Sequence, residues 1–143
     1  MSRVFLDASV LFAASYSQTG SSRDLLREAI RGNVKIVLSE HVLKETRRNL
    51  AQKAPEALSA FHELLTAIKP QIVRKPSLEE LKRAAAYIHL KDAPVVAAAV
   101  KAKVDCLVTW DRKHFIDDPR VAQKSGLAII TPDELMATIK RRE

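Results

Sequence analysis

The chain has 143 residues, 47% of them hydrophobic and 29% charged, which is the composition of one ordinary globular domain spanning residues 1–143. Its 24 Lys and Arg residues outnumber 17 Asp and Glu residues, so the formal net charge is +7, which favours an anionic partner such as nucleic acid but also suits plain solubility. A single cysteine excludes an internal disulfide framework, and the longest late apolar run, 93–100, is far shorter than the about 20 residues of a membrane span.

Short β-branched runs alternate with longer amphipathic stretches, a pattern typical of an α/β domain with a mainly parallel sheet. The first half predicts strand 3–7, a short helix from residue 9, a helix from residue 22 ended by Gly32, strand 34–38 and helix 39–52. Asp7 interrupts the apolar N-terminal stretch, and an ionised carboxylate there argues against a signal peptide. We therefore expect a cytoplasmic protein.

The second half continues the same alternation. It predicts helix 55–70, strand 71–74, helix 77–90, helix 92–103 capped by Asp92, strand 105–109, strand 127–130 and a last helix from Pro132. Capping boxes are expected where Ser77 precedes Glu80 and where Thr131 precedes Glu134. The whole pattern predicts three layers, with helices on both faces of a central sheet.

Four acidic residues stand at places where a parallel sheet presents side chains to a ligand. Asp7 ends the first predicted strand and Asp111 follows strand 105–109, and ligands bind beyond the carboxyl ends of such strands. Asp92 begins a helix and Glu45 lies within one. Each also has an ordinary structural explanation: a helix cap for Asp7 and Asp92, a turn for Asp111, and a solvent-exposed helix position for Glu45.

If the four acids converge, their chemistry is constrained. Carboxylates at close range repel one another, and some protonate unless a cation lies between them. Oxygen ligands without cysteine or clustered histidine suit Mg²⁺ or Mn²⁺. Such ions lower the pKa of a bound water and neutralise charge on a phosphate, so an acidic pocket in a basic chain fits phosphodiester hydrolysis.

Four segments in order, 4–11, 38–45, 91–99 and 107–111, resemble the PIN domain, a family of small metal-dependent ribonucleases that includes the toxins of VapBC-type toxin–antitoxin pairs. The resemblance implies a parallel sheet flanked by helices and an RNA substrate. It also implies a homodimer and, for a toxin, an antitoxin whose acidic or arginine-bearing tail blocks the site. The same domain also serves in RNA processing and decay without an antitoxin.

The resemblance assigns roles to individual residues. It implies that four acids bind Mg²⁺ or Mn²⁺ and position the hydrolytic water: Asp7, Glu45, Asp92 and Asp111. Ser9 and Thr109 match hydroxyl positions of the family, and each would either hydrogen-bond a ligating carboxylate or metal-bound water or simply cap the local backbone.

Basic and aromatic residues flank Asp111. Arg112, Lys113 and His114 would either contact a phosphate at the rim of the site or form a solvated basic loop. Trp110 would either stack on a base or, as we expect, pack against a neighbouring helix.

Two other functions compete with the nuclease. Asp7 after an apolar strand, together with Asp117 and Asp118, also fits a phosphohydrolase similar to the haloacid dehalogenases, but Ser9 stands where that chemistry needs a second acid. The two later acids would otherwise assist the nuclease site or form a turn before Pro119. The second alternative is a non-catalytic basic module that binds RNA or a partner, and the presence of all four acids counts against it.

Overall fold

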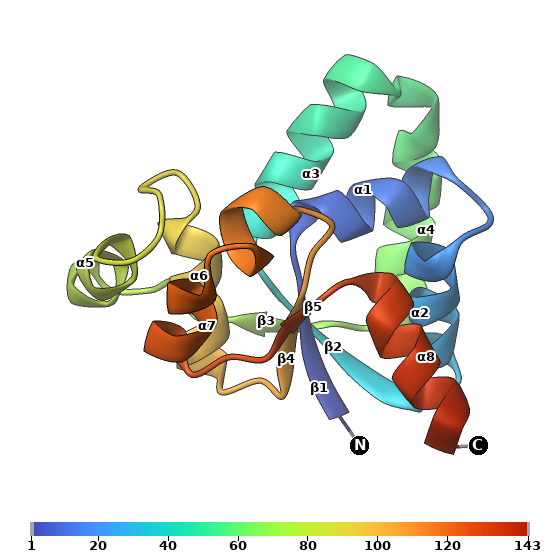
Figure 1. Cartoon of the computed structure of the whole chain (residues 1–143). Helices are drawn as coiled ribbons and strands as arrows, with labels where there is room; N and C mark the ends of the chain where they lie inside the picture. Colours follow the sequence, from blue (N-terminus) through green and yellow to red (C-terminus); the bar gives the residue numbers. More distant parts are fainter. Residues whose placement is uncertain (1, 143) are drawn as a thin grey trace.

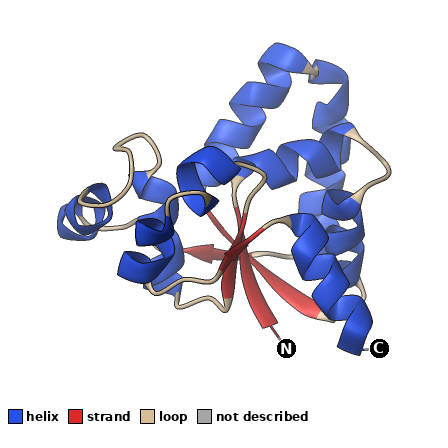
Figure 2. Cartoon of the chain, in the orientation of Figure 1, coloured by secondary structure: helices blue, strands red, loops and turns tan. Residues whose placement is uncertain are grey.

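A five-stranded, all-parallel sheet runs through the middle of the molecule (Figure 1). The computed structural model describes residues 2–142. Its strands are β1 (Ser2–Leu6), β2 (Val34–Ser39), β3 (Gln71–Val73), β4 (Cys106–Val108) and β5 (Ile129–Ile130), in the spatial order β3-β2-β1-β4-β5. Helices cover both faces of this sheet, which confirms the predicted three-layer α/β/α architecture (Figure 2).

The helices alternate with the strands along the chain. They are α1 (Ala8–Tyr16), α2 (Ser21–Ile30), α3 (Glu40–Lys53), α4 (Leu58–Ile68), α5 (Leu78–Ala85), α6 (Ala93–Ala102), α7 (Pro119–Ser125) and α8 (Pro132–Arg142), with short 3₁₀ and π turns at Pro55–Ala57 and Arg112–Ile116. Figure 1 shows α2, α4 and α8 on one side of the sheet and α5, α6 and α7 on the other. Within residues 2–142, no helix has both the length and the apolarity needed to cross a bilayer.

The order of the strands creates a crevice at the centre of the sheet. The chain builds outward from β1 through β2 to β3, then returns to place β4 on the opposite side of β1. The connections after β1 and after β4 therefore leave in opposite directions, and a crevice opens between them at the carboxyl ends of the strands. Asp7 directly follows β1 and Asp111 follows β4, so both stand at this crevice.

The central strands are buried on both faces, as expected for a parallel sheet between two layers of helices. Phe5 of β1, Val37 of β2 and Leu107 of β4 are each 0% exposed. Small residues let α6 approach the sheet closely, and Ala98 and Ala99 are fully buried. This packing fixes the strand ends from which the crevice is built.

The structure corrects several predicted boundaries. The helix predicted over 77–90 ends at Ala85, and the last strand is only Ile129–Ile130. Helix α7 was not predicted, although Asp118 caps it by accepting a hydrogen bond from the Arg120 backbone and Pro119 opens it. A proline at the first position and an N-cap aspartate are a helix signal, so this helix was detectable from the sequence.

Candidate active site

A cavity of about 490 Å³ opens at the carboxyl ends of β1 and β4. Its lining includes all four acids singled out from the sequence, which come from four separate parts of the chain: Asp7, Glu45, Asp92 and Asp111. Asp7 lies at the start of α1, Glu45 on α3, Asp92 just before α6, and Asp111 beyond β4. The fold therefore brings these four side chains to one cavity.

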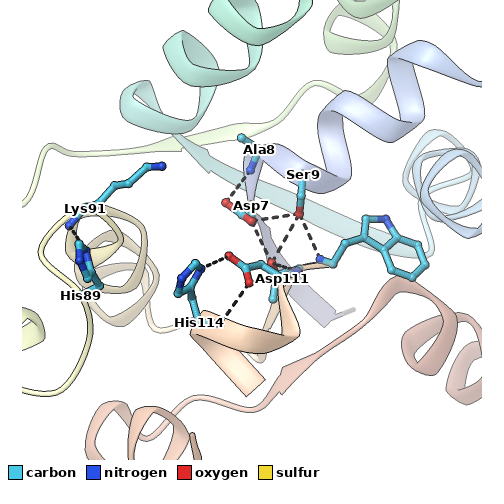
Figure 3. A network of polar contacts seen from close by, with 9 residues as sticks. Asp7, Ala8, Ser9, His89, Lys91, Asp111 and His114 are labelled. Atoms are coloured by element: carbon cyan, nitrogen blue, oxygen red, sulfur yellow. Dashed lines mark hydrogen bonds and ion pairs between the residues drawn. The ribbon is translucent and has the colours of Figure 1, made fainter. Parts of the chain in front are cut away.

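Asp7 is the most firmly held of the four carboxylates. It is 7% exposed, and its Oδ1 accepts a 2.8 Å hydrogen bond from the backbone N–H of Ala8. Its Oδ2 accepts hydrogen bonds from the hydroxyls of Ser9 at 3.0 Å and Thr109 at 2.9 Å (Figure 3). The expected cap of α1 is thus present, and the same carboxylate also faces the cavity.

The two hydroxyls connect Asp7 to the segment that carries Asp111. Ser9 Oγ accepts a 3.1 Å hydrogen bond from the backbone N–H of Trp110, and Thr109 Oγ1 accepts one of 3.0 Å from the backbone N–H of Asp111. Each hydroxyl therefore donates to the Asp7 carboxylate. Thr109 also satisfies a backbone group two residues away, so both of its readings are met. The backbone partner of Ser9 lies 101 residues away, just after β4, so Ser9 links two distant segments and is not the local cap that was its alternative.

Burial raises the pKa of Asp7, as expected for a carboxylate in a crowded acidic site. Removal from water raises the pKa of its carboxyl above the ordinary value, while hydrogen bonds from Thr109, Ser9 and Ala8 lower it, and the negative charge of Glu45 raises it. The ionised form is thus held by donated hydrogen bonds against its own desolvation.

Asp111 is engaged with His114. Its Oδ1 accepts a 3.1 Å hydrogen bond from the backbone N–H of His114, and its Oδ2 lies 2.7 Å from Nδ1 of the same residue (Figure 3). Asp111 therefore caps the Arg112–Ile116 turn, as its turn explanation expects, and lines the cavity as well.

The other two acids have opposite electrostatic environments. Glu45 Oε2 lies 3.3 Å from His41 Nε2, and this hydrogen bond is the main reason that the pKa of Glu45 is lowered. Burial is the main reason that the pKa of Asp92 is raised, and the charge of Asp111 raises it further while His114 opposes the shift. Asp92 stands at the N-cap position of α6 with a helical backbone (φ −95°, ψ −9°), so the predicted side-chain cap is wrong.

The donor set fits a hard divalent cation in kind. Four carboxylates around one cavity are the ligands that Mg²⁺ and Mn²⁺ prefer. Within residues 2–142, however, no three His, Cys, Asp or Glu side chains lie close enough together to hold an ion as they stand. Asp111 and Glu45 are turned toward histidines, and like charges separate carboxylates. These two carboxylates would have to move closer to Asp7 and Asp92 to share an ion with them.

The cavity also has basic and polar walls that the sequence analysis did not identify. Asn49, Lys53, His89 and Lys91 line it with the acids. Figure 3 shows His89 and Lys91 across from Asp7. Of these, Asn49 and Lys53 had a sequence signal, because they follow Glu45 at intervals of four residues and so share its face of α3.

Residues after Asp111 mostly lie outside this cavity. Arg112 pairs with Glu134 at 3.4 Å, and Lys113 lines a neighbouring cavity of about 340 Å³ that shares two histidines with the first. Trp110 Nε1 donates a 2.8 Å hydrogen bond to Ser22 Oγ on α2, which agrees with the expected packing against a helix. Asp118 pairs with Arg120 at 2.9 Å.

Comparison with solved structures supports the fold. One similar structure is PAE2754 from Pyrobaculum aerophilum, with a TM-score of 0.69 and 19% identity over 98% of this chain and 90% of that one. Another is VapBC2 from Rickettsia felis, solved bound to a DNA fragment from their promoter, with a TM-score of 0.65 and 17% identity over 90% of this chain and 98% of that one. A search of curated protein sequences found no match.

A sequence profile of the PIN domain matches residues 3–113, which include all four acids of the cavity. PIN domains are generally nucleases that use divalent metal ions. The match spans most of the chain and agrees with the parallel sheet and its strand-end crevice. The chain therefore belongs to the PIN domain family.

Proposed function

We propose that this protein is a divalent-metal-dependent endoribonuclease that hydrolyses RNA phosphodiester bonds. One observation carries the proposal: carboxylates from four separate segments line a single cavity at the crevice between β1 and β4. The formal net charge of +7 supports a polyanionic substrate. The alternative related to haloacid dehalogenases has less support, because Ser9, which donates to Asp7, stands where that chemistry needs a second acid, and Asp118 is paired with Arg120.

In this proposal each acid has a defined task. Asp7, held by three donated hydrogen bonds, is the fixed ligand of the site. Glu45, Asp92 and Asp111 complete the set that would hold Mg²⁺ or Mn²⁺. A bound divalent cation supplies two things, a lowered pKa for an attacking water and neutralisation of charge on the phosphate.

Other groups in and beside the cavity orient the Asp7 carboxylate and attract the substrate. Ser9 and Thr109 fix the orientation of the Asp7 carboxylate, because both hydroxyls donate to its Oδ2. Lys91 lies on the cavity wall, where its ammonium group attracts the phosphates of a strand. We assign Arg112 and Lys113 only a peripheral electrostatic role, since neither lines the cavity.

We further propose that the nuclease acts in the cytoplasm as the toxin of a VapBC-type pair. The structural likeness to VapBC2 supports this choice over an RNA-processing role. An antitoxin would inhibit the enzyme by covering the acidic cavity, and the toxin would be a homodimer. Co-purification with the product of a neighbouring reading frame, followed by size-exclusion chromatography with light scattering, tests the partner and the dimer together.

The nuclease itself is tested by incubating labelled single-stranded RNA with the protein and Mn²⁺, with and without EDTA. Asp92→Asn is the informative variant, because no hydrogen bond to the Asp92 side chain caps α6 within residues 2–142 and the fold should survive. Asp24→Asn is the matched control, since Asp24 lies on α2 and is paired with Arg27. Cleavage should need Mn²⁺, persist in Asp24→Asn and fall by more than about 100-fold in Asp92→Asn.

Two outcomes would overturn the proposal. Cleavage that is unchanged by EDTA and by the Asp92→Asn substitution would come from a contaminating ribonuclease. RNA binding without any cleavage would favour the non-catalytic basic module instead.

A further inference from the structure

One wall of the acidic cavity is aromatic. Phe12 of α1 lines the cavity together with the carboxylates. Tyr16 follows four residues later on the same helix, with its ring centroid 6.0 Å from that of Phe12 and the two rings inclined by only 12°. Tyr16 is 62% exposed, so the stacked pair continues the cavity wall outward and ends in an open ring face.

Another part of the lining, on α3, changes from acidic to basic along the helix. Glu45, Asn49 and Lys53 all line the cavity and are spaced by four residues, so they form one stripe along the helix. Residues four positions apart on a helix are about 6 Å apart along its axis, and this holds for the α3 stripe as it does for Phe12 and Tyr16 on α1. The α3 stripe and Phe12 therefore line one cavity, and Tyr16 extends the aromatic surface along α1 beyond it.

We propose that Phe12 and Tyr16 form a stacking site for the bases of single-stranded RNA, while Asn49 and Lys53 contact its phosphates. Aromatic faces beside a cationic wall are how proteins bind single strands with little sequence preference. Duplex RNA does not fit this site, because its bases already stack on one another. The inference rests on the proposed function, since the same strand would present its scissile phosphate to the acids.

The charges of the cavity favour nucleic acid over an apolar protein segment. An apolar helix covering Phe12 and Tyr16 would leave Lys53 and Asn49 facing its nonpolar side chains without polar partners. A phosphodiester strand satisfies both walls at once, because its bases are aromatic and its backbone is anionic. Tyr16, at the outer end of the stacked pair, offers the exposed ring face on which a base can stack.

The test is equilibrium binding of a fluorescently labelled oligouridine, followed by anisotropy in EDTA so that no cleavage occurs. Tyr16→Ala should weaken binding about fivefold to tenfold, and Tyr16→Phe should change it by less than about twofold. The control is Leu78→Ala, an exposed apolar residue of α5 (69% exposed) that lies outside the cavity. An abasic oligonucleotide of equal length should bind the wild type and Tyr16→Ala equally, which a merely structural effect would not produce.

Two results would overturn the stacking site. Unchanged oligouridine affinity in Tyr16→Ala would reject it and leave the aromatic surface to a protein partner. An equal loss for the abasic strand would reject it as well. This test and that of the nuclease can fail separately. If Tyr16→Ala weakens the binding of base-bearing RNA only, the stacking site is supported even when Mn²⁺ yields no cleavage. If Mn²⁺ yields cleavage but Tyr16→Ala leaves the affinity unchanged, only the nuclease is supported.

Discussion

Replacement of Thr109 by valine isolates the hydrogen bonds that hold Asp7 in place. Thr109 is fully buried, donates to Asp7 Oδ2 at 2.9 Å and accepts from the Asp111 backbone at 3.0 Å. A hydrogen bond to a charged group contributes about 1.5–3 kcal/mol and a neutral one about 1 kcal/mol. Ser9 still donates to the same oxygen in the variant, so the lower end applies. We expect a loss of about 2–3 kcal/mol of unfolding free energy, which lowers Tm by about 5–10 °C.

The loss should depend on pH, because the Thr109 hydrogen bond favours the ionised carboxylate. It is the largest of the hydrogen bonds that lower the pKa of Asp7, so its removal raises that pKa further. Above the folded pKa, where Asp7 is ionised, the variant suffers the full loss. As the pH falls and Asp7 becomes protonated in both proteins, the difference should shrink.

The assay is urea unfolding followed by circular dichroism in EDTA, at a series of pH values between 4 and 8. Thr46→Val is the matched control: Thr46 is also 0% exposed, but its hydroxyl donates to the backbone oxygen of Val42 at 2.8 Å and touches no carboxylate. Its effect should not vary with pH. A Thr109→Val loss below about 1 kcal/mol, or one equal at both ends of the pH series, would refute the assignment of Thr109 to Asp7.

Three further predictions concern the same site and its surroundings. Asp7→Asn should raise the metal-free Tm at pH 7 and abolish cleavage. The pKa of Asp7 is raised, so above that pKa its ionised form destabilises the folded state, and the neutral amide removes this cost. A lower Tm in differential scanning calorimetry would contradict this. Mn²⁺ at 100 times its Kd should stabilise the wild type by about 2.7 kcal/mol and Asp92→Asn by less, and equal Tm shifts would argue against a role for Asp92 as a ligand. The Cys106 thiol, buried and with its pKa raised to about 12, should resist iodoacetamide at pH 8 until urea unfolds the chain, as mass spectrometry of the adduct would show; rapid native labelling would contradict its burial.

Much of the fold was predictable because the hydrophobic pattern of each segment agrees with the place of that segment in the sheet. The β-branched runs at 34–38 and 105–109 form strands that are buried on both faces, and their alternation with helices leads directly to a parallel sheet. The acids Asp7 and Asp111 were predictable for the same reason, since both follow strands whose carboxyl ends meet at one crevice.

The remaining features depend on tertiary packing. The apolar periodicity of α5 continues to Ile88, which is buried although the helix has ended at Ala85, so nothing in the local sequence marks the boundary. The engagement of Asp111 with His114 arises from the backbone of a π turn, which has no reliable sequence signature. The aromatic wall required knowledge that Phe12 and Lys53, far apart in sequence, line the same space.

The position of β4 beside β1 has a consequence for the chain during its synthesis. β4 lies next to the first strand, and Asp111 comes after it, so the cavity gains its last wall only when more than three quarters of the protein exists. A product released early by interrupted translation would carry Asp7, Glu45 and Asp92 without their fourth partner. The topology thus ties the completion of the acidic pocket to the near-completion of the polypeptide.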